Sequence, residues 1–426
     1  MGHIAVKDVY EKLGNKIDSL STRVALNKTF YEILKELYTE KEADFICRMP
    51  YGFSSLKKIV KVAKFSEAAV KERLASLCSK GLVMDILSRG KFYYMLSPMV
   101  VGIFEFTMMR TDDKVDSKKM ASLFHRYMLG DDEFFAKNFK SGDKAAIMRT
   151  LPYEEAIKKN DGYVEILSYE KAKDIIEQAK KISVGLCSCR HEKLHLDKKE
   201  CDIPLDTCTS FNKSADFLIR NNFAKELSKS GMLEKLAQSK EAGLVLNADN
   251  VQKSVNYLCH CCKCCCNLFL AINKHGITNI IMTSNFIAQI DPSSCVGCGL
   301  CADACPVNAI SMIEDKNSNA KKDRRPKIDK KFCLGCGVCG LKCKTEAIKL
   351  IPRKQRVITP EDALEKTLLQ CIERETLQYQ LFDDPNRITH KFARTFVGAF
   401  LRLSPVKRAL VSGRLKSAFL NFVKKG

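Results

Sequence analysis

Apolar residues between positions 27 and 81 recur at the spacing of buried helix faces. The first set predicts one helix and consists of Phe30, Ile33, Leu34 and Leu37. Ser54 or Ser55 is the expected N-cap of a second helix that runs through Val62. Ser66 is the expected cap of a third helix, which ends at Gly81 because glycine tolerates the left-handed conformation of a helix terminus. The positions that this third helix is expected to bury are Val70, Leu74, Leu77 and Cys78.

The pattern then changes to that of a β-hairpin. Leu82–Leu87 and Phe92–Leu96 are short apolar runs, and the Ser88–Lys91 segment between them has the composition of a β-turn. Three helices followed by a hairpin resemble a winged-helix domain, which we expect over residues 1–110. The resemblance implies either a docking or dimerising module or a nucleic-acid-binding domain. The basic residues that would meet DNA phosphates are Lys57, Lys58, Lys61, Lys71, Arg73, Lys80, Arg89 and Lys91.

Four further parts follow the hairpin, so the chain is predicted to be a multidomain α+β protein. They are a charged connecting segment (residues 111–149), a mainly helical, cysteine-rich middle (150–284), a module with a cysteine repeat (285–355) and a basic amphipathic helical tail (356–426). Thr359 and Pro360 predict a helix start in the tail, with Thr359 as the cap. The apolar tail positions at helical spacing are Phe392, Phe396, Phe400 and Leu403 and, beyond Pro405, Leu410, Leu415, Phe419 and Phe422.

The composition of the 426-residue chain points to a chemical role for cysteine. It contains 21 cysteines and no tryptophan, a count that disulfides or metal sites would explain. The first residues lack the basic and apolar regions of a secretion signal, and no stretch is long and apolar enough to span a bilayer. We therefore expect a cytoplasmic protein, because a reducing compartment favours thiolate–metal bonds over disulfides.

The formal net charge of +21 raises the question of an anionic partner. About half of this excess lies after Asn386, where ten basic residues occur without an acidic one. One interpretation is that the tail helices make peripheral contact with an anionic membrane or an acidic partner. The other is that their apolar side covers the protein's own core while their basic side stays hydrated.

An offset of 38 residues relates the two halves of the cysteine-repeat module. The segment 291–301 matches 329–339, and 309–310 matches 347–348. Each half has the spacing C-x2-C-x2-C-x3-C, in which three thiolates surround one face of a cluster and the fourth ligand comes from elsewhere. The glycines at 297, 299, 335 and 337 are expected to give these loops positive φ angles and to bring backbone N–H groups toward sulfur.

With this spacing the module resembles the bacterial ferredoxins that carry two [4Fe–4S] clusters, over about sixty residues. The resemblance implies that the fourth cysteine of each half binds the cluster of the other half. The implied ligands are Cys295, Cys298, Cys301 and Cys343 for the first cluster, and Cys333, Cys336, Cys339 and Cys305 for the second. Pro306 follows Cys305 as in the family, but Lys344 replaces the proline expected after Cys343, and residues 316–327 lengthen the connection between the halves.

The middle contains ten more cysteines in two sequence groups. They are Cys187, Cys189, Cys201 and Cys208, followed by Cys259, Cys261, Cys262, Cys264, Cys265 and Cys266. Six thiols within eight residues are too dense for core packing, so some are expected to bind metal. Consecutive cysteines cannot all face one cubane; either two clusters share the segment or some thiols are spectators. One or two further iron–sulfur clusters are favoured over zinc or a redox-active thiol site, and the layout resembles cysteine-rich regions upstream of two-cluster ferredoxin modules in anaerobic bacteria.

The predicted function is low-potential electron transfer between redox partner proteins in an anaerobic cytoplasm, through at least two [4Fe–4S] clusters. A redox-responsive DNA-binding regulator is the second hypothesis, disfavoured because the clusters exceed what a sensor usually needs. The third is an oxidoreductase subunit with a catalytic cluster in the middle region. No G-x-G-x-x-G motif follows a predicted strand and no G-x-x-x-x-G-K-[ST] motif occurs, so electrons are expected to enter and leave through proteins.

Overall fold

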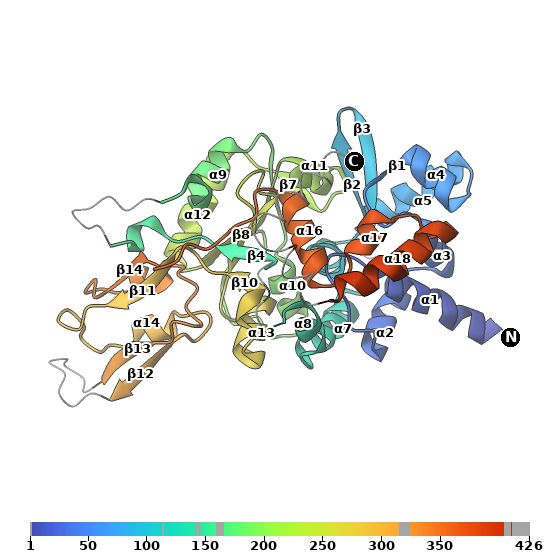
Figure 1. Cartoon of the computed structure of the whole chain (residues 1–426). Helices are drawn as coiled ribbons and strands as arrows, with labels where there is room; N and C mark the ends of the chain where they lie inside the picture. The colour runs from blue at the N-terminus through green and yellow to red at the C-terminus, as the bar shows by residue number, and fades with distance from the viewer. Residues whose placement is uncertain are drawn as a thin grey trace. The chain divides into compact units, whose positions relative to one another are not determined.

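The computed structural model of the chain describes residues 2–112, 115–140, 143, 146–158, 166–314, 324–403 and 410. Contacts between residues divide the chain into two units. The first consists of residues 1–145, 217–223 and 363–426, and the second of residues 146–216 and 224–362 (Figure 1). The second unit contains the cysteine-rich middle and the cysteine repeat, which therefore belong to one compact body.

Three helices of the first unit form where the sequence predicts them. They are α2 (Lys28–Leu37), α4 (Leu56–Ala63) and α5 (Glu67–Ser79). Ser55 caps α4 and Ser66 caps α5, whose N-terminal hydrogen bond runs from Ala69 N to Ser66 Oγ at 3.3 Å. Every position predicted to be buried on α2 and α5 is buried. A further helix, α3 (Glu40–Arg48), was not predicted and begins with a reciprocal capping box between Thr39 and Glu42.

The predicted hairpin consists of β2 (Val83–Ser88) and β3 (Lys91–Leu96). Arg89 and Gly90 both have positive φ, 50° and 73°, as in the two-residue turns that match the twist of an antiparallel pair. A short strand, β1 (Ser54–Ser55), pairs with β3, so the sheet order is β1-β3-β2. The sheet therefore joins the start of α4 to the hairpin that follows α5.

The rest of the first unit is helical in its described residues. Its elements are α1 (Gly2–Asp18), η1 (Met99–Ile103), α6 (Phe104–Met109), α7 (Ser117–Leu129), α8 (Glu133–Asn138), α16 (Ala363–Glu373), α17 (Leu377–Leu381) and α18 (Ile388–Leu401). The segment expected to be a connector thus contains α7 and α8. Tyr127 on α7 stacks on Phe30 with ring centroids 5.4 Å apart, and its hydroxyl accepts a 2.8 Å hydrogen bond from Ala25 N. These contacts make the segment part of the unit's core.

The middle region is built on a seven-stranded sheet, which corrects the prediction that it is mainly helical. The strands are β4 (Met148–Thr150), β5 (Ile182–Gly185), β6 (Cys208–Phe211), β7 (Ala224–Glu226), β8 (Val245–Asp249), β9 (Tyr257–Cys261) and β10 (Ile281–Met282). Their order is β10-β4-β8-β9-β6-β5-β7, antiparallel except for β10–β4. The strands are short, and β8 is buried along its whole length although it includes Asn247 and Asp249. No alternation of polar and apolar residues therefore marks this strand in the sequence.

Helices and short 3-10 turns alternate with the strands of this sheet along the chain. They are η2 (Glu154–Ala156), η3 (Ser168–Glu170), α9 (Ala172–Gln178), α10 (Ser188–His195), α11 (Asn212–Arg220), α12 (Lys229–Glu241), α13 (Asn267–His275) and η4 (Thr278–Ile280). Two of them, α10 and α13, begin directly after Cys187 and Cys266. Each of these two helices therefore has a cysteine as its N-cap residue.

The cysteine-repeat module has the internal symmetry that its sequence predicts. Its elements are β11 (Phe286–Ile290), α14 (Leu300–Asp303), β12 (Ile310–Glu314), β13 (Arg324–Ile328), α15 (Val338–Leu341) and β14 (Ile348–Pro352). β11 pairs with β14 and β12 with β13, so strands of the two halves interlock. Asp291 N donates to Ala347 O at 2.7 Å, and the equivalent bond from Asp329 N to Ala309 O is 2.8 Å. These matched bonds hold each half against the other.

The segment before α16 differs from the prediction that Thr359 caps a helix. The helix begins at Ala363, because residues 359–361 instead accept hydrogen bonds from the 252–253 segment of the second unit. Gln252 N donates to Pro360 O and Lys253 N to Glu361 O, both at 2.9 Å. No helix in the described part of the chain is long and apolar enough to cross a lipid bilayer.

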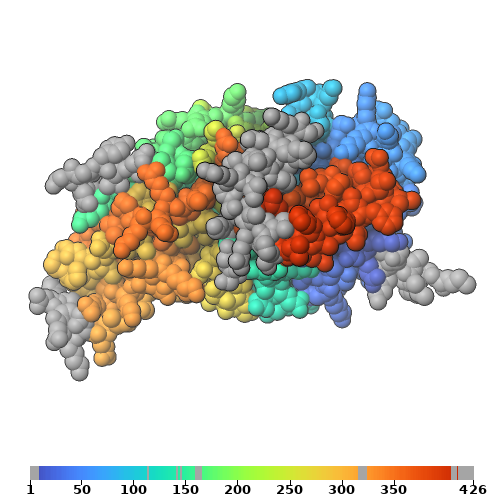
Figure 2. All heavy atoms as spheres, viewed as in Figure 1, coloured from blue at the N-terminus to red at the C-terminus, as the bar shows by residue number. Residues whose placement is uncertain are grey.

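Part of the apolar side of α18 covers a core in the described residues: Val397 packs against the cluster that contains Leu401, as does the predicted tail position Leu410. Phe392 and Phe396 are 73% and 79% exposed, and Figure 2 shows the red residues of this part of the chain at the surface. Only Gly398 and Leu401 of α18 are buried, with Leu401 packed in a cluster that includes Leu368 and Leu377. The predicted positions 415, 419 and 422 lie outside the described residues.

Candidate metal centres

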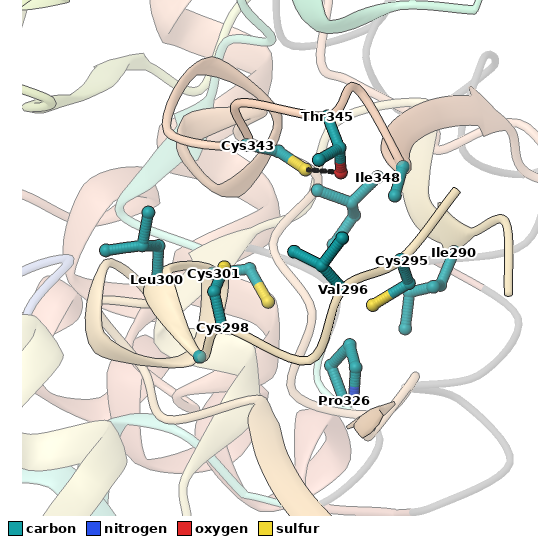
Figure 3. Close-up of a pocket in the computed structure, with 12 residues that line it drawn as sticks. Ile290, Cys295, Val296, Cys298, Leu300, Cys301, Pro326, Cys343, Thr345 and Ile348 are labelled. Carbon is teal, nitrogen blue, oxygen red and sulfur yellow. Dashed lines mark hydrogen bonds between the residues drawn. The ribbon is translucent and has the colours of Figure 1, made fainter. Parts of the chain in front are cut away.

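The first candidate ligand set combines cysteines from both halves of the repeat. Cys295, Cys298 and Cys301 come from the loop before α14 and from α14 itself, and Cys343 follows α15. All four line one pocket, whose other lining residues include Val296 and several of the neighbouring apolar side chains (Figure 3). The structure thus brings together the four residues that the ferredoxin resemblance implied for one cluster.

The second candidate set is Cys305, Cys333, Cys336 and Cys339. The Cys339 thiol lies within electrostatic range of the other three and also of Cys301. Cys305 Sγ accepts a 3.2 Å hydrogen bond from Ala309 N, and further backbone N–H groups donate to Cys336 and Cys305. The two sets are therefore neighbours, each with one cysteine from the opposite half.

The loops around these thiols have the predicted glycine conformations. Gly297 and Gly299 have φ of 66° and 89°, and Gly335 and Gly337 have φ of 70° and 85°. A Cβ on Gly335 would lie 2.1 Å from Phe286 O, so a side chain is sterically excluded there. The loops consequently turn sharply enough to present three thiols from a short segment.

The second set is more buried than the first. Burial also raises the pKa of thiols in both sets, so they stay protonated at neutral pH. Cys298 is exposed, whereas Cys333, Cys336 and Cys339 are each 8% exposed. Burial raises the pKa of Cys336 to about 12 and that of Cys301 to about 11. Such thiols become ligands only when a metal supplies the positive charge that stabilises the thiolate.

An arginine holds each cysteine loop of the module. Arg324 Nε donates to Gly297 O at 3.0 Å, and its Nη2 donates to Cys298 O at 3.3 Å. Arg353 Nη2 donates to Cys333 O at 2.6 Å, and Tyr153 N donates to Cys336 O at 3.0 Å. The second loop is thus covered by the middle region, in agreement with its greater burial.

The ten middle cysteines separate into two spatial sets that differ from their two sequence groups. One set has four members, Cys201, Cys262, Cys264 and Cys265, whose Sγ atoms all lie within 4.8 Å of one another. The other six are linked by thiol–thiol hydrogen bonds or electrostatic contacts and are Cys187, Cys189, Cys208, Cys259, Cys261 and Cys266. The segment 259–266 therefore contributes to both sets.

Two strands and two helix starts build the six-cysteine set. Cys208 and Cys259 are register partners on β6 and β9, and Cys261 lies two residues along β9, on the same face as Cys259. Cys187 and Cys266 are the N-cap residues of α10 and α13, where backbone N–H groups and the helix dipole favour negative charge. Burial nevertheless keeps the pKa of the Cys187 thiol raised, so the helix terminus alone does not ionise it.

Within these sets two thiols have lowered pKa values. Hydrogen bonds from the Cys259 and Cys266 thiols lower the pKa of Cys261 to about 6. The Cys265 thiol and the Arg190 guanidinium lower the pKa of Cys262 to about 4. Burial raises the pKa of Cys187 to about 12. One thiol in each set is thus favoured as an anion before any metal binds.

Arg190 on α10 lies between the two sets. Its side chain hydrogen-bonds Cys262 of the four-cysteine set and has favourable electrostatic contacts with Cys187 and Cys261 of the other set, which with Cys262 raise its pKa. Arg190 is fully buried, with Nη2 donating to His260 O at 2.6 Å and Nη1 bonded to Thr207 Oγ1. A buried guanidinium here compensates the negative charge that thiolates bring.

The polar burial of α10 was missed by sequence reasoning. Glu192 and Lys193 are 0% and 1% exposed, and both bond Asn267 on α13, at 2.5 Å and 2.6 Å. A charged run normally indicates a solvated face, so only its position directly after Cys187 and Cys189 signalled another role. The network ties together the two helices whose first residues belong to the six-cysteine set.

Residues 294–347 match the family model described as a 4Fe-4S dicluster domain. No curated protein and no solved structure shows significant similarity to the chain. The matched segment includes all eight repeat cysteines and the loops, helices and crossover that group them. The domain and the additional cysteine clusters support iron–sulfur redox chemistry, and the chain therefore contains an iron–sulfur domain of the ferredoxin type.

Proposed function

We propose that the protein transfers single electrons between partner proteins through two [4Fe–4S] clusters in its ferredoxin-type domain. The proposed ligands are the eight repeat cysteines, Cys295, Cys298, Cys301 and Cys343 for one cluster and Cys305, Cys333, Cys336 and Cys339 for the other. The observation that carries the proposal is the crossover: each four-thiol set takes three cysteines from one half and one from the other. When bound, such clusters accept and donate one electron at a time.

The surroundings of the thiols suit this role. Backbone N–H groups point at Cys305 and Cys336, and two arginines fix the loops at Gly297 and Cys333. Hydrogen bonds and positive charge near sulfur set the potential of a cluster, and burial excludes water from it. The chain's own residues therefore supply what a ferredoxin site needs beyond its ligands.

The difference in burial between the two repeat sets supports an electron path that starts at the exposed first set and leads through the buried second set toward the middle region. Cys298 and Leu300 are exposed, whereas Cys339 lies deeper and in electrostatic contact with Cys301. Exposed Lys344 follows Cys343, so the accessible set offers positive charge to an acidic redox partner. We therefore propose that partner proteins dock beside the first set.

We also propose that the six-cysteine set holds a further iron–sulfur cluster. Leu244 packs against Cys262 and Cys265, and nearby Glu241 O accepts a 3.1 Å hydrogen bond from Lys342 Nζ, next to Cys343. Cys262 in turn contacts Arg190, which reaches the six-cysteine set. The cysteine sets of the second unit are thus connected through packed residues rather than dispersed.

The contacts of the first unit do not favour the DNA-binding alternative. Lys71 and Lys80 pair with Glu67 and Glu42 at 2.7 Å and 2.6 Å. The Arg73 guanidinium lies 4.3 Å from the centroid of the Phe65 ring. These side chains, which the winged-helix resemblance assigned to a DNA-facing helix, have partners within the unit.

For α18 we propose peripheral contact with an anionic lipid surface. Ile388, Phe392 and Phe396 are 68% to 79% exposed at successive helical turns, next to Arg387 and Lys391. Exposed phenylalanines flanked by basic residues are typical of helices that lie in a membrane interface. This role is separate from the redox centres.

The test uses full-length protein purified without oxygen, with iron, zinc and acid-labile sulfide measured per chain and paramagnetic resonance recorded after reduction. The domain predicts about eight iron and eight sulfide, and about twelve if the six-cysteine set adds a cluster. Stopped-flow oxidation of the reduced protein by a one-electron acceptor should lose the contribution of one cluster in Cys298→Ser and of the other in Cys336→Ser, whereas the control Cys47→Ser should keep both. Zinc without sulfide would overturn the proposal, whereas substrate-induced spectral changes that survive loss of the repeat clusters would favour the oxidoreductase alternative.

A further inference from the structure

The sulfur atoms of the four-cysteine set lie closer together than those of the sets assigned to clusters. Cys201 Sγ lies 3.7 Å from Cys262 Sγ, Cys264 Sγ lies 3.8 Å from Cys262 Sγ, and the Cys264 and Cys265 sulfurs are 3.4 Å apart. All four sulfurs fall within 4.8 Å of one another. Among the described residues, no other group of histidines, cysteines or carboxylates meets this limit.

These distances match the coordination sphere of a single ion. Four sulfurs at about 2.3 Å from a central metal form a tetrahedron whose edges are about 3.8 Å long. A cubane binds each thiolate on a different iron, so its four sulfurs must stand farther apart than around one ion. Cys295, Cys298, Cys301 and Cys343 of the same molecule line one pocket and do not meet the 4.8 Å limit, which provides an internal comparison.

A disulfide does not account for the arrangement. The sulfurs of the sequence neighbours Cys264 and Cys265 are 3.4 Å apart, well beyond the roughly 2.05 Å of a sulfur–sulfur bond. All four residues are free thiols, and two of them, Cys262 and Cys265, are buried. The four ionisable thiols are therefore packed together without a covalent bond between any two of them.

The chain has assembled the set from distant parts. Cys201 lies in the loop after α10, and Cys262, Cys264 and Cys265 form the turn between β9 and α13. Leu244 and Ile203 pack around the sulfurs, and Arg190 bonds Cys262 from α10. A divalent cation between the sulfurs together with Arg190 would supply three positive charges against four thiolates, so one negative charge would remain in this closed site.

We propose that Cys201, Cys262, Cys264 and Cys265 bind one tetrahedral metal ion rather than an iron–sulfur cluster. Zinc and mononuclear iron both take a four-sulfur tetrahedron. The ion joins residues 61 positions apart and fixes the turn between β9 and α13. Because Cys261 and Cys266 flank this turn, the ion also positions two thiols of the six-cysteine set. The inference goes beyond the proposed electron transfer and does not depend on it.

The first test compares metal and sulfide in Cys264→Ser, Cys201→Ser and the control Cys47→Ser, each as full-length protein purified without oxygen. We expect both site variants to lose about one metal ion per chain and no sulfide, while the control keeps its content. Loss of zinc identifies a structural zinc ion, and loss of iron with a high-spin ferric resonance identifies mononuclear iron. Loss of about four iron together with four sulfide, or no loss of metal, overturns the proposal.

The second test needs no variant and therefore does not depend on variant folding. X-ray absorption of the unmodified protein at the zinc edge should show four sulfur neighbours at about 2.3 Å without a nearby metal. Where zinc is absent, the iron of protein stripped of its acid-labile sulfide clusters should give that same shell. A zinc edge with nitrogen or oxygen neighbours, or an iron edge with only clustered iron, contradicts the assignment.

Discussion

Cys208 and Cys259 stand directly opposite each other on the antiparallel strands β6 and β9, and their thiols are hydrogen-bonded. Cys262, three residues after Cys259, belongs to the other middle set. We therefore expect Cys208→Ser and Cys259→Ser to remove the same centre and Cys262→Ser to remove a different one. The two strand variants should each lose about four iron and four sulfide per chain, measured on anaerobic protein.

The matched control for these variants is Cys47→Ser, since Cys47 is far from all cysteine sets in the sequence and only partly buried. It should retain all metal and sulfide. If Cys208→Ser and Cys262→Ser lost identical amounts of iron, sulfide and zinc, the division into two middle sets would be wrong.

The two repeat clusters should differ in their sensitivity to oxygen. Cys298 is exposed, whereas Cys336 and its partners Cys333 and Cys339 are 8% exposed. Because oxygen attacks accessible clusters, the centre that remains in Cys336→Ser should bleach several-fold faster in air than the centre that remains in Cys298→Ser. The decay is followed by visible absorption and by paramagnetic resonance of samples reduced after timed exposure. Equal decay rates would show that burial does not protect the second set.

Removing Arg353 should lower the potential of the second cluster. Its guanidinium donates to Cys333 O at 2.6 Å and to Ser284 O at 3.1 Å, and it is largely enclosed. A nearby cation stabilises the reduced cluster, so Arg353→Leu should shift the potential to more negative values by roughly 40 mV for about 1 kcal/mol of lost interaction.

The control for this prediction is Lys331→Leu, which removes an exposed charge two residues from Cys333. Solvent screens that charge, so redox titration should find a shift well below that of Arg353→Leu. A positive shift in Arg353→Leu would contradict the electrostatic explanation.

Burial of Lys16 predicts a pH-dependent stability of the first unit. Lys16 is 3% exposed and lies 4.5 Å above the Tyr51 ring, and burial lowers its pKa to about 7 from 10.5. Between these two pH values the unfolded chain binds the proton and the folded chain does not, so stability rises with pH through this window. Replacing the ammonium should therefore stabilise the unit more at pH 7, by about 4 kcal/mol, than at pH 9, by about 2 kcal/mol, and least near pH 10.

The measurement is the difference in melting temperature between Lys16→Met and the unmodified protein at pH 7 and pH 9. Comparing full-length chains at each pH cancels the pH dependence of the metal centres. The hydrogen bond from Lys16 Nζ to Cys47 O, at 3.4 Å, is lost in the variant and offsets part of the gain. A difference that grows from pH 7 to pH 9 would have the wrong sign.

The exposed face of α18 predicts binding to anionic vesicles. Phe392 and Phe396 are the most exposed large apolar residues of this helix. The double change Phe392→Ser and Phe396→Ser should weaken sedimentation with phosphatidylserine-containing vesicles about tenfold or more, while neutral vesicles bind neither protein. The control Leu401→Ser replaces a buried residue of the same helix, so it should lower the melting temperature and leave vesicle binding unchanged. Unchanged sedimentation of the double variant would exclude this face as the contact.

The sequence by itself determined the elements that depend on local chemistry. Caps such as Ser66, the positive-φ turn at Arg89 and Gly90 and the 38-residue repeat all follow from short-range rules, because they need only the residues within a few positions. Spacing and family resemblance predicted two ligand sets for the eight repeat cysteines, and the four residues of the first set line one pocket. Their crossover was implied by the resemblance to two-cluster ferredoxins.

Tertiary structure decided the middle region and the orientation of the tail. β8 is buried on both faces and contains Asn247 and Asp249, so its sequence has no strand period, and the seven-stranded sheet was not predicted beside the helices of the middle region. Once β9 is recognised, Cys259 and Cys261 share a face, but only long-range folding brings Cys201 to Cys262 and leaves the phenylalanines of α18 exposed. Amphipathic spacing identifies a face and cysteine spacing identifies a ligand, but neither specifies the distant residue that will meet it.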